Sequence, residues 1–100
     1  MIFLIEKFSN IKNLLILTMN SLIELNNNID NLRFEIAICN EQIRKMSEVL
    51  CLFVEDPKIF EDRYAMLQKF YFHRQELSNE CMKKELERRH IRQIQTEISS

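Results

Sequence analysis

Residues 50–67, LCLFVEDPKIFEDRYAML, contain the one proline of a 100-residue sequence that has no glycine. Proline lacks an amide hydrogen and disfavours helical geometry in the residue before it. We therefore expect a long helix to end near Glu55-Asp56. Asp56 is then in position to cap a second helix that has Pro57 as its first residue and continues from about Lys58 to the C-terminus. The sequence predicts two helices and one break.

Upstream of the break, core-type positions alternate in steps of three and four residues. One set is Phe8, Leu15, Leu22, Ile29, Ile36, Ile43 and Leu50, and the other is Ile11, Thr18, Leu25, Leu32, Cys39, Met46 and Phe53. All are apolar except Thr18. A 3.5-residue repeat is typical of a helix that packs along one seam. We expect a single helix from about the N-terminus to Val54, whose seam needs the second half of the chain, another subunit, or both.

Further apolar residues lie off this seam. They are Leu14, Ile16, Leu17, Ile23, Phe34 and Ile38. The positions beside the seam are mostly neutral and polar, such as Asn26, Asn40 and Ser47, so interhelical charge adds little pairing specificity. A two-stranded coiled coil does not need the extra apolar residues, and the pattern favours an element of a helical bundle.

The second helix carries a predicted apolar row on one face. Its members are Phe60, Tyr64, Leu67, Tyr71, Leu77 and Cys81, continued more thinly by Ile91, Ile94 and Ile98. The last segment, KKELERRHIRQIQTEISS, is charged and less apolar. We expect it to project into solvent or to fray. The fold class expected from the whole pattern is all-α, an elongated helical hairpin or bundle fragment.

Composition narrows the class of protein. Hydrophobic residues make up 46% and charged residues 29% of the chain, with a net charge of −1, so no global field favours nucleic acid. No stretch approaches about 18 unbroken apolar residues, and we expect no membrane span. The three cysteines, Cys39, Cys51 and Cys81, lack CxxC spacing and sit among apolar positions, which is typical of reduced, buried thiols. We expect a cytoplasmic protein.

The residues around the break resemble the C-terminal part of the formin homology 2 domain. In that family a coiled-coil helix ends in a "YF-x-EDP" type break, and a helix with spaced aromatic residues follows, with a Glu/Asn pair and a basic stretch. The matching positions here are Leu52, Phe53, Glu55, Asp56, Pro57, Phe70, Phe72, Asn79, Glu80, Lys83, Lys84, Arg88 and Arg89. The resemblance covers roughly residues 14–90. Between Pro57 and Asn79 the segment is a few residues shorter than usual.

The resemblance implies a partial formin-homology-2-like module spanning residues 1–100. Residues 1–55 would be its coiled-coil helix, residues 57–82 a post-like aromatic helix and residues 83–100 a charged helical tail. A complete domain of the family is several times longer and has a Gly-Asn-x-Met-Asn type segment, which a chain without glycine does not contain. The implied partner is actin, in the cytoskeleton, and in the family the coiled-coil and post regions receive the partner's lasso segment and help the dimer to surround actin.

Catalytic, metal and cofactor chemistry finds no support in the sequence. His73 and His90 lack metal-ligand spacing with each other, and Cys81 is eight residues from His73, about 12 Å along a helix and too far for a nucleophile and its base. Without glycine there is no loop to cradle a phosphate. We expect neither an enzyme nor a cofactor-binding protein.

Two groups of residues are candidate interaction sites, and each has two interpretations. The aromatic group is Phe60, Tyr64, Phe70, Tyr71 and Phe72, which either form plain core or line an exposed pocket for a partner segment. The basic group is Lys83, Lys84, Arg88 and Arg89, which either form ion pairs with Glu85 and Glu87 along a solvated helix or contact an acidic partner such as the actin filament.

Two functions are consistent with these patterns. The first is a formin-like actin-binding and actin-assembly module, which acts through dimerisation and filament contact and is incomplete on its own. The second is a generic coiled-coil scaffold subunit of a cytoplasmic or kinetochore-type complex, which binds another helical subunit and has no actin role.

Overall fold

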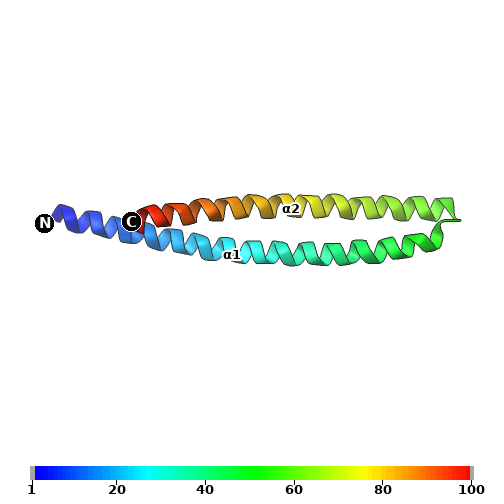
Figure 1. Cartoon of the computed structure of the whole chain (residues 1–100), viewed down its shortest axis with the longest axis horizontal. Helices are drawn as coiled ribbons and strands as arrows, with labels where there is room; N and C mark the ends of the chain where they lie inside the picture. Colours follow the sequence, from blue (N-terminus) through cyan, green and yellow to red (C-terminus); the bar gives the residue numbers. More distant parts are fainter. Residues whose placement is uncertain (1, 100) are drawn as a thin grey trace. The chain divides into compact units, whose positions relative to one another are not determined.

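The chain folds into two long α-helices joined by a short connection, in a computed structural model that describes residues 2–99. Helix α1 spans Ile2–Leu50, a 3₁₀ turn η1 spans Cys51–Phe53, and α2 spans Pro57–Ser99 (Figure 1). Within residues 2–99 there is no strand. The predicted all-α hairpin with its break at Asp56-Pro57 is confirmed.

The end of α1 differs in detail from the expectation. The α-helix ends at Leu50 rather than at Val54, and Cys51–Phe53 continue it as a tighter 3₁₀ turn. The amide of Asp56 donates to the carbonyl of Phe53 at 3.0 Å, which closes the turn. Short 3₁₀ segments are common at helix ends because i→i+3 bonds use carbonyls that would otherwise lack a partner.

The start of α2 is the predicted one. Pro57 is its first residue, where the missing amide hydrogen costs nothing. The Asp56 carboxylate Oδ1 accepts a hydrogen bond from the amide of Ile59 at 3.4 Å, and the Asp56 carbonyl accepts one from the amide of Phe60 at 2.9 Å. Asp56 is therefore the N-cap of α2.

Contacts along the chain divide it into two compact units. Unit 1 combines Met1–Asp30 of the N-terminal half with Met82–Ser100 of the C-terminal half, and unit 2 is Asn31–Cys81, which contains the turn. Each unit pairs a segment of α1 with a segment of α2. The two units are described separately below.

Unit 2 has a small core. Cys39, Ile43 and Leu67 are buried together, and Met46, Leu50 and Phe70 pack against them partly buried. The Cys39 thiol donates to the carbonyl of Phe70 at 3.4 Å, which links the two helices directly.

Unit 1 is built around Leu25 and Ile29 of α1, both buried. Ile29 is 0% exposed, the largest fully buried side chain among those described. From α2, Ile91, Ile94 and Ile98 are half-buried, as are Arg88 and Gln95. The expectation that the segment after Lys83 projects into solvent or frays is therefore wrong: α2 continues to Ser99, and one face of it is covered.

The seam predicted for α1 is covered from Leu15 onward but not at Ile11. Its members from Leu15 to Phe53 are all buried or half-buried, while Ile11 is 41% exposed. The side chain of Phe8 lies outside the described residues.

The row predicted for α2 is partly wrong. Phe60, Leu67, Leu77 and Cys81 are buried or half-buried as expected, but Tyr64 is 48% and Tyr71 36% exposed.

The covered positions of α2 in unit 2 instead include Phe70 and Arg74. Leu67, Phe70, Arg74, Leu77 and Cys81 follow the same alternation of three and four residues as α1, which Tyr71 does not. A long arginine can occupy such a position because its methylene groups pack while the charged head stays at the edge.

The exposure of Cys51 also differs from the expectation. Cys39 and Cys81 are buried, as expected, but Cys51 is exposed in the turn. Its thiol donates to the carbonyl of Ser47 at 3.5 Å.

Candidate interaction surfaces

Polar side chains join the two helices in each unit. In unit 2, Nη1 of Arg74 donates to the amide oxygen of Asn40 at 3.0 Å, and the guanidinium lies 4.9 Å from the ring centroid of Tyr71. A cation over an aromatic face is favourable because the ring carries negative charge above its plane. Arg74 therefore contacts both Asn40 on α1 and the exposed ring of Tyr71 on α2.

Unit 1 also has such contacts among its described residues. Nη1 of Arg88 donates to the amide oxygen of Asn26 at 3.0 Å. Nε2 of Gln95 donates to the hydroxyl of Thr18 at 3.4 Å, and that hydroxyl donates to the carbonyl of Leu15 at 2.9 Å. Thr18 is the one polar residue of the predicted seam, and its hydroxyl has partners on both sides.

The predicted basic group divides into two kinds of residue. Lys83 and Arg89 are exposed on α2, whereas Lys84 and Arg88 are half-buried. Arg88 donates a hydrogen bond to Asn26, so its guanidinium has a partner within unit 1. Lys83 and Arg89 are the two of the group whose charges face solvent.

The predicted aromatic group, all in unit 2, also divides. Phe70 packs on the core and Phe60 is half-buried, while Phe72 is 67% exposed. Phe60 and Tyr64 stack with ring centroids 6.1 Å apart and planes 10° from parallel. These side chains do not form one pocket. Phe60 and Phe70 are at least half-covered, and Tyr64, Tyr71 and Phe72 lie on the surface.

An apolar exposed surface lies on α1 in unit 1. Its large exposed side chains are Ile11, Leu14, Ile16, Leu17, Met19 and Ile23. A helix that is apolar on every side is typically buried on every side, and one segment of α2 covers only one of these sides. Residues 11–23 therefore offer the strongest candidate docking surface.

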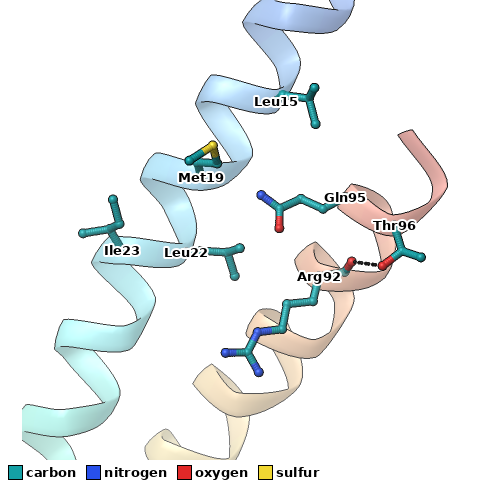
Figure 2. A pocket seen from close by; sticks show the side chains of 7 residues that line it. All are labelled: Leu15, Met19, Leu22, Ile23, Arg92, Gln95 and Thr96. Carbon is teal, nitrogen blue, oxygen red and sulfur yellow. Dashed lines mark hydrogen bonds between the residues drawn. The ribbon is translucent and has the colours of Figure 1, made fainter. Parts of the chain in front are cut away.

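An open groove of about 1010 Å³ lies along this surface. It is lined by Leu15, Met19, Leu22, Ile23, Arg92, Gln95 and Thr96, as Figure 2 shows. Leu15 and Leu22 point toward α2, and Ile23 points away from it. The hydroxyl of Thr96 donates to the carbonyl of Arg92 at 3.0 Å. Met19 was not among the residues predicted from the sequence, although its spacing of three from Ile16 and four from Ile23 places all three on one helix face.

Unit 2 has two smaller hollows. One, of about 140 Å³, is lined by Lys45, Met46, Val49, Arg63 and Met66; the other, of about 210 Å³, is lined by Glu35, Ile38, Cys39, Gln42, Phe70 and His73. The guanidinium of Arg63 lies 4.5 Å from the ring centroid of Phe53.

Three charged side chains form an exposed cluster on α1 in unit 2. Arg44 forms two hydrogen bonds with the Glu41 carboxylate, at 2.6 and 3.1 Å, and one with Glu48 at 2.6 Å. The Arg44 hydrogen bonds and charge lower the pKa of Glu41 below its ordinary value of 4.5, and the two carboxylates raise the pKa of Arg44. These are ion pairs of a solvated helix face.

The histidine, cysteine and acidic side chains of the described residues are spread along the two helices. No group of three or more His, Cys, Asp or Glu side chains there is arranged to hold a metal ion. Nδ1 of His73 lies 3.9 Å from the Glu76 carboxylate on the exposed side of α2. No helix within the described residues is long and apolar enough to cross a bilayer.

Comparison with known proteins gives no match: no family model matches the chain, and no curated protein or solved structure is significantly similar to it.

Proposed function

We propose that this chain is a helical protein–protein interaction module of the formin type, which self-associates and contacts actin filaments and is incomplete on its own. The observation that carries the proposal is the order of its elements. A heptad helix ends in a turn at Cys51–Phe53, Asp56 caps the next helix, and Pro57 begins it, which is the order that the resemblance in LCLFVEDPKIF implies.

Two exposed cations supply the filament contact in this proposal. Lys83 and Arg89 project from α2 into solvent, and the actin filament surface is acidic. Contacts between exposed charges weaken as salt rises, because the screening length falls to about 10 Å at 0.1 M ionic strength. Binding through these residues should therefore depend strongly on salt.

Co-sedimentation of the purified chain with actin filaments tests the proposal. We expect pelleting at low ionic strength, reduced pelleting at high ionic strength, and loss of pelleting in the double variant Lys83→Glu with Arg89→Glu. The matched control applies the same charge reversal at two exposed lysines of unit 2, Lys45→Glu with Lys58→Glu, and should still pellet. Equal pelleting by both double variants, or no pelleting of the unaltered chain at low salt, would contradict an actin role through Lys83 and Arg89.

A helical scaffold subunit without an actin role is the second candidate. The observation that favours it is the apolar surface of residues 11–23, which suits another helix better than an acidic filament. If the chain does not pellet with actin but binds a helical subunit through this surface, the scaffold function replaces the first proposal.

A further inference from the structure

We infer that the face of α1 formed by Ile16, Met19 and Ile23 binds the same face of a second copy of this chain, with the two α1 helices antiparallel. This inference rests on the self-association included in the proposed function and assigns a surface to it. The surface lies entirely in unit 1, whereas the aromatic group belongs to unit 2.

The three side chains form one contiguous apolar strip. They are 46%, 55% and 58% exposed, and their spacing of three and then four residues places them on one side of the helix. Met19 and Ile23 also line the groove beside them, whose inner wall is Leu15 and Leu22 (Figure 2). An incoming helix would therefore meet a ridge with an apolar furrow next to it, which is the geometry of helix packing in bundles.

The accessible surface area of the chain is larger than that of a compact monomeric protein of the same mass. The accessible surface is 8098 Å² for 12.2 kDa. A compact monomeric protein of that mass exposes about 6100 Å². The difference, about 2000 Å², exceeds the roughly 800 Å² that each partner buries in an interface of standard size. This surplus is spread over the whole chain, and the strip of Ile16, Met19 and Ile23 is an apolar part of the exposed surface.

The charges around the strip favour a second copy in the antiparallel orientation. On α1, Lys12 is exposed before the strip and Asp30 is exposed after it. Glu24 is the one charged residue between them in the sequence. Glu24 follows Leu17 by seven residues and so lies on the same side of the helix as Leu17, away from the strip. Two antiparallel copies therefore place the Lys12 end of one against the Asp30 end of the other, whereas parallel copies place like charges together.

The oligomeric mass of the full chain tests this inference. We expect sedimentation equilibrium at high micromolar concentration to give twice 12.2 kDa for the unaltered chain. Met19→Glu places a charge in the interface twice by symmetry, and we expect it to raise the dissociation constant by tenfold or more, on the order of a central contact in a small interface. Leu17→Glu is the matched control: it is the same kind of change on the other side of the same helix, and it should remain dimeric.

Charge exchange tests the orientation. Lys12→Glu alone and Asp30→Lys alone should each weaken the dimer by about tenfold, because the symmetric dimer contains the pair twice and each exposed pair contributes about threefold, and the double variant should restore it. Circular dichroism of every variant checks that helicity is kept.

Three results would overturn the inference: a monomeric unaltered chain, a Met19→Glu variant that stays dimeric, or equal dissociation of Leu17→Glu and Met19→Glu. A double charge variant weaker than both single variants would overturn the antiparallel orientation. None of these measurements uses actin, so a failure of actin binding and a failure of this interface are read separately.

Discussion

Arg88 and Asn26, which are 62 residues apart in the sequence, are joined by a hydrogen bond of 3.0 Å from guanidinium to amide oxygen. Both side chains are half-buried in unit 1. A residue of the basic group predicted from the sequence therefore joins α2 to α1 within unit 1. The acceptor is a neutral amide oxygen, so the bond gives the guanidinium a hydrogen-bond partner without adding a second charge to the seam.

Arg88→Ala should destabilise the chain. The variant removes both a charge-assisted hydrogen bond and the methylene groups that cover the seam, and we expect the free energy of unfolding to fall by about 1 kcal/mol or slightly more. Urea denaturation followed by circular dichroism measures this change. Arg89→Ala, one residue later on the exposed side, should stay within about 0.5 kcal/mol of the parent. Equal effects of the two variants would show that the bond to Asn26 contributes nothing.

Asp56→Ala should weaken the start of α2. The carboxylate accepts the Ile59 amide, and loss of an N-cap typically costs about 1 kcal/mol. Thermal unfolding of the variant should show a midpoint lowered by several degrees, since about 1 kcal/mol corresponds to roughly 4–8 °C in a domain of this size. Glu55→Ala is the control, because Glu55 precedes the cap. If both variants melt alike, Asp56 does not act as the cap.

The three thiols should differ in reactivity. Cys51 is exposed in the turn, whereas Cys39 and Cys81 are buried. A thiol reagent added to the native chain should modify one cysteine rapidly and the other two only as the helices open, since access limits the reaction of a buried thiol. Mass spectrometry after limited labelling identifies the site. In Cys51→Ser the rapid phase should vanish, and its persistence would contradict the placement of Cys51.

The pH dependence of Glu41 should depend on Arg44. Hydrogen bonds from Arg44 lower the pKa of Glu41 in the folded state, so this pair stabilises the fold above the unfolded-state pKa of the carboxyl. That contribution is lost as pH falls through the lower folded-state pKa. In Arg44→Gln, NMR titration should show the pKa of Glu41 returned toward 4.5. Lys45→Gln, which removes a weaker electrostatic neighbour, should shift it less.

Most of the fold was predictable from local patterns. The apolar repeat from Leu15 to Phe53 predicted which side of α1 is covered, because a 3.5-residue period admits one seam. The single proline predicted the break and the cap, because its backbone chemistry acts on its immediate neighbours. The end of α1 at Leu50 was not predictable, since Cys51–Phe53 have no residue that stops an α-helix.

The candidate sites were less predictable. The basic group was predicted from its charge and from the resemblance, and only the structure separates exposed Arg89 from Arg88, which binds Asn26. Met19 was overlooked because an exposed methionine between polar neighbours resembles ordinary surface in the sequence. Its significance comes from Ile16 and Ile23 on the same face and from the groove between the helices.

By itself, the sequence determined that this chain is helical, where its helices are separated, and which side of the first one is covered, because these depend on residues close together along the chain. The tertiary structure alone decided which side of the second helix is covered. Apolar content favoured the row through Tyr64 and Tyr71, but the observed packing covers Phe70 and Arg74 and leaves Tyr64 48% and Tyr71 36% exposed. The physical reason is that the contacts of this side join residues far apart in the sequence, such as Arg74 and Asn40, which are 34 residues apart.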